Sequence, residues 1–228
     1  MSEHGKYTVT VSIIARNEER MIEEVVKGCQ PYADELLVMD GHSTDCTRDI
    51  ATAAGARVEM DGGLGKGEAV RRVGRMALGD IIVFIDADGS HDPADIPKLV
   101  APIKSGAADL VIASRPRGGS DEMTGDLPKL IRTIGSHIIT LAINYRFNVR
   151  LTESQNGYRA IRKDALNSLC LKENIFTIEQ EMLMKTLKKR LRVDEIPSHE
   201  YERRYGESQI NVWKVWHRYV WCVIKNIL

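Results

Sequence analysis

The sequence predicts an α/β fold in which a mostly parallel sheet carries helices on both faces. Four short apolar runs are rich in β-branched residues, as fully buried parallel strands are. They lie at residues 8–15, 35–39, 81–85 and 109–113. Helix-length segments separate them, at 18–29, 44–55 and 66–78. Repeated strand–helix–strand units of this kind favour a parallel sheet covered on both sides.

Composition limits the classes of protein to consider. With 228 residues the chain can form one large domain or two small ones, and its 43% apolar content is ordinary for a soluble protein. Lys plus Arg and Asp plus Glu balance at 32 each, so the charge gives no reason to expect a nucleic-acid partner. The four cysteines (Cys29, Cys46, Cys170, Cys222) lack metal-ligand spacing. We expect reduced thiols in a cytosolic protein.

The chain shows no membrane-crossing signal. Its first residues, "MSEHGKYTVTVSIIARNEE", lack the apolar stretch of a signal peptide. No uninterrupted apolar run approaches the roughly 20 residues that span a bilayer. We expect a cytoplasmic protein that is soluble or lies on a membrane without crossing it.

Polar residues follow each predicted strand. They are Asn17-Glu18, Asp40-Gly41, Asp86-Ala87-Asp88 and Ser114-Arg115. Any one of these pairs would suit an ordinary turn. In parallel α/β sheets, however, ligands bind outside the carboxyl ends of the strands. Together the four positions therefore predict a binding site at this edge of the sheet.

The segment "VFIDADGSHDP" (83–93) ends a predicted strand with two aspartates. Alternate residues of a strand share a face, so Asp86 and Asp88 can point the same way. Carboxylates this close repel unless a cation or hydrogen bonds lie between them, and carboxylate oxygens suit Mg²⁺ or Mn²⁺. The alternative is that they cap a helix starting near Pro93.

Eight motifs occur in an order that resembles the family 2 glycosyltransferases of the GT-A fold, in their dolichyl-phosphate mannosyltransferase-like branch. These are "VSIIARNEE", "VMDGHSTDCT", "GLGKGEAV", "DADGSHDP", "VIASRPRGG", "QNGYRAIRKDAL", "FTIEQEML" and "YERRYGESQ". The resemblance covers nearly the whole chain. It implies a GT-A (Rossmann-like) sheet and an enzyme that uses a nucleotide sugar.

The resemblance also assigns donor-site residues. Those implied for the nucleotide are Asn17, Glu18, Asp40, Lys66, Asp86 and Ala87. Asp40 would read the base, and Lys66 would meet the base or the diphosphate unless it is a solvated charge. Asp86 and Asp88 would hold Mg²⁺ or Mn²⁺. Ser90 stands where relatives often carry a glutamine ligand, so a hydroxyl or water would replace that ligand.

An acceptor phosphate is implied by a second set. The members are Arg115, Arg132 with Ser136 on the same helix face, and Arg203 ahead of Gly206-Glu207-Ser208. Arg204 is the neighbouring candidate for the last position. Arginine forks suit phosphate geometry, and a lipid phosphate is already anionic, so it needs positioning more than deprotonation. The implied acceptor is a polyprenyl phosphate, either dolichyl or undecaprenyl.

The implied catalytic set is Asp88, Arg115, Arg132 and Glu153. Glu153 would orient the donor sugar or act as a base toward a hydroxyl acceptor. Glu179 and Glu181 open a helix, where acidic side chains are favoured anyway, and a catalytic role is the other interpretation.

The predicted organisation is a catalytic domain over residues 1–209, with a nucleotide-sugar half to about 115 and an acceptor half from 116, followed by an amphipathic C-terminal helix at 210–228. A polar glycine-rich loop (115–126) leads to a helix starting near Pro128. The last helix gathers Trp213, Trp216 and Trp221 beside basic residues, which suits a membrane headgroup zone at the cytoplasmic face. Packing on the core, or on a second copy in a homo-oligomer, is the alternative.

The expected reaction is metal-dependent transfer of a sugar, with inversion, from a nucleotide sugar to a polyprenyl phosphate. UDP is favoured over GDP, and the sugar itself is not identified. A soluble hydroxyl acceptor, such as a sugar acid or a nascent glycan, is the alternative on the same fold. A nucleotidyltransferase is disfavoured because "ARNEER" after the first strand lacks the glycine-rich loop of that class.

Overall fold

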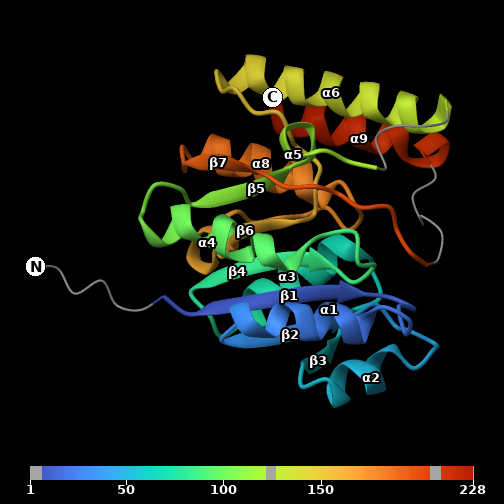
Figure 1. Ribbon diagram of the computed structural model, residues 1–228. Helices are drawn as coiled ribbons and strands as arrows, with labels where there is room; N and C mark the ends of the chain where they lie inside the picture. The colour runs from blue at the N-terminus through green and yellow to red at the C-terminus, as the bar shows by residue number, and fades with distance from the viewer. Residues whose placement is uncertain (1–6, 122–126, 206–211, 228) are drawn as a thin grey trace, which may run out of the picture.

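The computed structural model describes residues 7–121, 127–205 and 212–227. One seven-stranded sheet runs through the molecule in the order β3-β2-β1-β4-β6-β5-β7 (Figure 1). The strands are β1 (Val9–Ala15), β2 (Glu35–Asp40), β3 (Arg57–Met60), β4 (Ile81–Asp86), β5 (Leu110–Ser114), β6 (Arg159–Arg162) and β7 (Val193–Pro197). Every pairing is parallel except those of β6, which runs antiparallel to β4 and β5. The predicted mostly parallel sheet is confirmed.

The register of the central strands brings their carboxyl ends together. Ala15 of β1 pairs with Asp40 of β2, and Ile14 pairs with Asp86 of β4. The polar residues that follow these strands therefore leave the sheet at one edge, as the sequence predicts.

The helices are α1 (Ile22–Cys29), α2 (Thr47–Ala53), α3 (Lys66–Met76), α4 (Ile96–Lys104), α5 (Arg115–Gly118), α6 (Leu127–Phe147), α7 (Lys163–Ser168), α8 (Ile178–Lys188) and α9 (Val212–Ile227), with 3-10 turns at Gln30–Tyr32 and Pro93–Asp95. The first helix begins four residues later than predicted, because the Glu18 carbonyl accepts bonds from the amides of Met21 and Ile22 in a turn. Likewise α2 starts at Thr47, whose amide and hydroxyl are bound by Asp45. The loop expected from 115 opens instead with α5, and residues 122–126 lie outside the described part.

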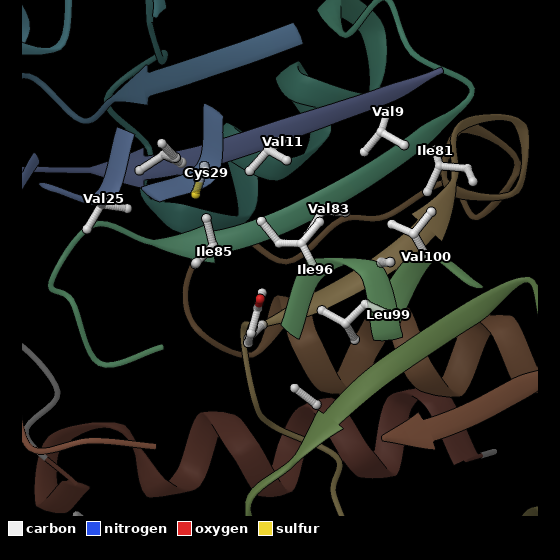
Figure 2. Close-up of a cluster of buried hydrophobic side chains, with 14 of the residues drawn as sticks. Val9, Val11, Val25, Cys29, Ile81, Val83, Ile85, Ile96, Leu99 and Val100 are labelled. Carbon is white, nitrogen blue, oxygen red and sulfur yellow. The ribbon is translucent and has the colours of Figure 1, made fainter. Parts of the chain in front are cut away.

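Alternate strand residues separate two apolar layers. On one face, side chains of β1 and β4 pack against α1 and α4 (Figure 2). The contributors labelled there are Val9, Val11, Ile81, Val83 and Ile85 from the strands, and Val25, Cys29, Ile96, Leu99 and Val100 from the helices. This fully buried layer fixes β4, and with it the position of Asp86 at the strand's end.

The other face carries a thicker cover. Helices α3, α7 and α8 pack on the sheet, α9 packs on α8, and α6 packs on both α8 and α9 (Figure 1). Cys222 of α9 and Ile143 of α6 are completely buried in this layer with Phe84 of β4. The C-terminal helix therefore joins the core along one face.

The opposite faces of α6 and α9 are apolar and exposed. They show Ile134, Ile138, Leu141, Trp216 and Trp221, of which Leu141 is 65% and Trp221 61% accessible. The side chain of Trp213 lies outside the described set. Across the described ranges, no helix is both long enough and apolar enough to cross a bilayer.

Candidate functional site

A cavity of about 840 Å³ opens at the carboxyl edge of β1 and β4. Its walls come from four regions: these strand ends, the start of α3, one face of α6 with part of α9, and the segment after β7. Most of the predicted site residues line it. They are Glu18, Lys66, Asp86, Ala87, Asp88, Ser90, Arg115, Arg132, Ser136 and Arg203.

The two aspartates of the D-x-D segment each hold a different side-chain cation. The Lys66 Nζ lies 2.7 Å from Asp86 Oδ1, and the Arg203 Nη2 lies 2.6 Å from Asp88 Oδ2. The helix-capping interpretation is wrong, since Asp92 accepts the bond from the Ala94 amide at that turn. Both carboxylates are therefore directed at cations in the cavity.

Ser90 binds the carboxylate of Asp88. Its hydroxyl donates to Asp88 Oδ1 at 2.7 Å, and its amide donates to the same oxygen at 3.0 Å. Burial would raise the pKa of Asp86, but the charges and hydrogen bond around it, those of Lys66 foremost, together lower the pKa of the carboxyl. The described residues include no group of three or more His, Cys, Asp or Glu side chains arranged around a metal. A cation here would take its remaining ligands from substrate or water.

Lys66 is fixed by the glycines on either side of it. Gly65 is the N-cap residue of α3 and has φ 107°, a conformation that glycine adopts without strain. The Gly67 amide donates to the Asn174 carbonyl, and a Cβ on Gly67 would lie 2.2 Å from the Glu173 carbonyl oxygen. This contact places the Lys66 side chain, which is 11% exposed, between Asp86 and Glu179 rather than in solvent. Burial lowers its pKa, but the two carboxylates outweigh that effect and raise it.

At the ends of β1 and β2, the residues predicted to bind the nucleotide have different environments. Glu18 lines the cavity, whereas Asp40 is completely buried and accepts bonds from the amide and hydroxyl of Ser43. The Asn17 Oδ1 likewise accepts from the Thr44 amide at 2.8 Å. In this structure Asn17 and Asp40 hold the loop after β2. A further acidic residue that lines the cavity is Asp61, which follows β3, a strand that the sequence did not reveal.

Glu18 has an unusual electrostatic environment. Burial raises its pKa to about 7, with Asp88 and Asp86 adding to the effect and Arg203 opposing it. The Arg203 Nη1 lies 3.6 Å from Glu18 Oε1. The site therefore concentrates acidic groups that a bound cation would stabilise.

Arg115 reaches the cavity from the end of β5 and is held from behind by Glu153. Its Nε and Nη2 donate to the Glu153 carboxylate at 2.7 and 3.1 Å, and its Nη1 lies 3.3 Å from Glu200 Oε1. Glu153 is 2% exposed, does not line the cavity, and accepts three further backbone amides at Oε1. Burial would raise its pKa, yet Arg115 and these bonds lower it. The geometry therefore suits Glu153 to positioning Arg115 rather than to acting as a base toward a group in the cavity.

The acceptor side is built on helices. Arg132 and Ser136, one turn apart on α6, both line the cavity, beside apolar Ile131 and Ile138 of α6 and Trp216 of α9. Of the two adjacent arginines, Arg203 faces the cavity, and Arg204 pairs at the surface with Glu24. Gly206, Glu207 and Ser208 lie outside the described residues.

Two further buried residues, His91 and Glu179, line the cavity. His91 stacks on Tyr158 with ring centroids 4.9 Å apart, and burial lowers its pKa, which favours the neutral ring. Glu179 is 4% exposed and places Oε1 3.0 Å from Lys66 Nζ. Within the described ranges neither His91 Nδ1 nor Glu179 Oε2 has a hydrogen-bond partner. The sequence left Glu179 open between a helix-start role and a catalytic one, and in the structure it lines the cavity.

Comparison with known sequences gives a consistent result. Residues 10–170 match the model of a family described as Glycosyl transferase family 2. The chain is 32% identical to Glycosyltransferase AglJ of Haloferax volcanii over 84% of its own length, and it spans 62% of that relative. It is 31% identical to the Undecaprenyl-phosphate mannosyltransferase of Micrococcus luteus, covering 78% of this chain and 76% of the relative.

Comparison with solved structures agrees with the fold. Glucosyl-3-phosphoglycerate synthase of Mycobacterium tuberculosis, in complex with Mn²⁺, UDP and glucosyl-3-phosphoglycerate, superposes with a TM-score of 0.76 at 25% sequence identity. The match covers 97% of this chain and 80% of that structure. The fold of this chain thus recurs in an enzyme crystallised with a metal, a nucleotide and a glycosylated product.

Proposed function

The chain belongs to glycosyl transferase family 2, and from that premise we propose that it transfers a sugar, with inversion, from a nucleotide sugar to a polyprenyl phosphate. UDP is the favoured nucleotide, because the similar solved enzyme was crystallised with UDP. The lipid acceptor is suggested by the similarity to an undecaprenyl-phosphate mannosyltransferase. The cavity supplies the arguments from this chain's own residues.

The donor side suits a divalent cation with a diphosphate. Asp86 and Asp88, with the Ser90 hydroxyl beside them, are the residues that would hold Mg²⁺ or Mn²⁺, which favour oxygen ligands. These carboxylates suit a metal ion because each already binds a positive charge in the cavity. Asp86 binds Lys66, and Asp88 binds Arg203. When bound, the metal stabilises negative charge on the departing diphosphate.

The chemistry at the acceptor side needs no base in this chain. A phosphate oxygen of the acceptor attacks the anomeric carbon on the side opposite the diphosphate, forming one C–O bond while the bond to the diphosphate breaks. Arg132 and Ser136 would bind the acceptor phosphate, and Arg115, held by Glu153, would add a fixed positive charge. Arg203 would join them when its bond to Asp88 is released. A buried, low-pKa Glu153 is compatible with an acceptor that is already anionic.

The observation that carries the lipid acceptor is the continuity between the cavity and an exposed apolar surface. Ile131, Ile138 and Trp216 line the cavity, and the same helices expose Leu141 and Trp221 beyond it. Exposed apolar residues in such number mark an interaction surface. We assign this face to the membrane, where the prenyl chain of the acceptor resides, with a second copy of the chain as the competing occupant.

A water-soluble acceptor is the second candidate. It is favoured by the similarity to glucosyl-3-phosphoglycerate synthase across 97% of this chain. That enzyme's name specifies a phosphorylated acceptor, so a cluster of arginines alone does not separate the two candidates. The apolar face does, because a small soluble acceptor does not require it.

The test supplies the purified chain with Mn²⁺ and each of a panel of UDP- and GDP-sugars. Undecaprenyl phosphate in vesicles is one acceptor, and 3-phosphoglycerate in solution is the other. We expect nucleoside diphosphate release and a glycolipid with the first acceptor only. Turnover of 3-phosphoglycerate without lipid would establish the soluble alternative. Sedimentation with and without vesicles would reveal a dimer that covers the apolar face.

A further inference from the structure

We propose that Tyr219 of the C-terminal helix is a further acceptor-binding residue, whose phenol hydroxyl donates a hydrogen bond to the phosphate of the acceptor. The inference rests on the proposed function, because it places a phosphorylated acceptor in the cavity. Tyr219 is partly buried and lines the cavity. The assignment makes α9 a part of the catalytic site in addition to a part of the apolar face.

Two contacts hold α9 against the start of α8. The Tyr219 carbonyl accepts a hydrogen bond from Gln180 Nε2 at 2.9 Å, and the Cys222 thiol donates to the Thr177 carbonyl at 3.7 Å. Gln180 directly follows Glu179, which lines the cavity on the donor side. The backbone of Tyr219 is therefore fixed near the place where donor and acceptor must meet.

Tyr219 lies between a buried face of α9 and a face that lines the cavity. Cys222 is completely buried and Asn226 is 4% exposed. Trp216 and Val220 line the cavity and are 57% and 44% exposed. With about 3.6 residues per turn, the helix places residue 219 at the boundary between these faces. An amphiphilic acceptor whose apolar chain follows Trp216 and Val220 would have its phosphate at the same boundary.

The charges around the Tyr219 hydroxyl come from both sides of the cavity. Burial raises the pKa of the phenol, so the hydroxyl keeps its proton and can donate. The charged groups that act on it are Glu179 and Lys66 on the donor side and Arg132 and Arg115 on the acceptor side. A neutral donor at this position can bind an anionic oxygen without adding charge to a site that already contains two arginines.

The experiment compares Tyr219→Phe with the unaltered chain, using Mn²⁺, the UDP- or GDP-sugar that the unaltered chain turns over, and undecaprenyl phosphate in vesicles. The variant removes one hydroxyl and keeps the ring, so Tm and vesicle binding should not change. Acceptor kcat/KM should fall at least about 10-fold, as expected for one hydrogen bond to a charged group. Affinity for the free nucleoside diphosphate should stay within a few-fold.

A double variant separates a shared ligand from a structural role. Residues that share one partner have non-additive effects. If Tyr219 and Arg132 bind the same phosphate, Arg132→Ala/Tyr219→Phe should lose less than the product of the two single losses. Added salt should reduce the loss in Arg132→Ala but not that in Tyr219→Phe, because only the first variant removes a charge.

Tyr145→Phe is the matched control. Tyr145 lies on α6, is 94% exposed and does not line the cavity, so its variant should keep acceptor kcat/KM unchanged. Unchanged acceptor kcat/KM in Tyr219→Phe as well, a loss confined to nucleotide affinity, or single losses that multiply in the double variant would overturn the inference while leaving the proposed function intact. Failure of the unaltered chain to glycosylate undecaprenyl phosphate would instead overturn the proposed function, and the inference with it.

Discussion

The two sides of the cavity are built in different ways. On the donor side, Lys66 joins Asp86 and Glu179 in a chain of ion pairs at the end of β4, and of the three side chains Asp86 is the most accessible, at 32%. On the acceptor side, α6 and α9 present Ile138 and Trp216, which are 60% and 57% exposed. One side is held rigidly by internal partners, and the other leaves large apolar groups in solvent.

This difference indicates which partner each side awaits. Charged side chains that are already held in place can stabilise charge that develops on a bound group in the transition state. They do so without having to rearrange during the reaction. Exposed apolar side chains gain stability only when something apolar covers them. The donor side therefore already has the charges that a small anionic ligand requires, whereas the acceptor side needs an apolar surface to cover its exposed side chains.

The two D-x-D carboxylates also differ in how firmly their cation partners are held. Asp86 is paired with Lys66, whose side chain is 11% exposed and anchored at the start of α3. Asp88 is paired with Arg203, on the segment after β7, whose side chain is 27% exposed. The first pair is part of the fixed wall, and the second is the one we expect a metal to displace.

The largest effect should come from Asp88→Asn, which keeps the size of the side chain and removes its charge. Turnover with Mn²⁺ should fall at least about 100-fold, the usual cost of losing one major electrostatic contact in an active site. The measurement is nucleoside diphosphate release by enzyme treated with EDTA and resupplied with Mn²⁺. Asp92→Asn is the control, because Asp92 only caps a 3-10 turn and does not line the cavity. Full activity of Asp88→Asn would contradict the metal assignment.

The next effect concerns the acceptor side. Arg132→Ala should lower acceptor kcat/KM by about 10–100-fold, because a charge-assisted bond to phosphate contributes roughly 1.5–3 kcal/mol. Arg132→Lys should recover part of the loss, since lysine offers no planar two-donor fork. Donor affinity, measured without acceptor, should stay unchanged. Arg146→Ala is the control on the same helix, outside the cavity lining. Equal losses for donor and acceptor would assign Arg132 to the donor or to the fold.

Much of the donor side could be predicted from the sequence, because the buried strands there are continuous apolar runs. Val83 to Ile85 identify β4, and the register then places Asp86 beside the ends of β1 and β2. The strands β3, β6 and β7 escaped prediction because they are short and carry charges such as Arg57, Arg159 and Glu195. Their apolar periodicity is too brief to recognise.

Side-chain environments were harder to predict than positions. The sequence shows a carboxylate at Glu153, but only the fold surrounds it with the Arg115 guanidinium and three amides. Asp40 stands at a strand end as predicted, yet Ser43 binds its carboxylate. The sequence left a catalytic role for Glu179 open, but only the packing of α8 on the sheet brings that side chain to the cavity.

A third effect, of about 10-fold, tests the apolar face itself. Trp221→Ser should weaken binding of the full chain to anionic vesicles by that amount, since partial burial of one large apolar side chain contributes about 1.4 kcal/mol. Flotation with vesicles is the measurement, and nucleoside diphosphate affinity should not change. Leu78→Ser is the matched control, because Leu78 is 76% exposed but lies at the end of α3, away from α6 and α9. Equal vesicle binding by both variants would remove the membrane assignment.

The smallest effect combines a gain in Mn²⁺ affinity with a loss in acceptor kcat/KM. Arg203→Gln removes the guanidinium that lies 2.6 Å from Asp88 and 3.6 Å from Glu18. A metal ion that binds Asp88 must displace this cation, so its removal should raise Mn²⁺ affinity in the absence of nucleotide. A partly exposed pair contributes about 0.2–1 kcal/mol, so the gain should be at most about 5-fold. Isothermal titration with Mn²⁺ alone measures it.

The same variant should lower acceptor kcat/KM, because Arg203 would no longer be available for the phosphate. Tighter metal binding together with weaker acceptor use is the pattern expected of a residue shared between the two sides. Arg204→Gln should change neither quantity, since Arg204 pairs only with Glu24 at the surface in the described contacts. If Mn²⁺ affinity stays constant in Arg203→Gln while acceptor use falls, the Arg203–Asp88 pair does not oppose metal binding. Metal binding and acceptor binding would then be independent of each other. If Mn²⁺ affinity falls instead, Arg203 holds Asp88 in place for the metal, and the Arg203–Asp88 pair belongs to the fixed wall of the donor side together with Lys66 and Asp86.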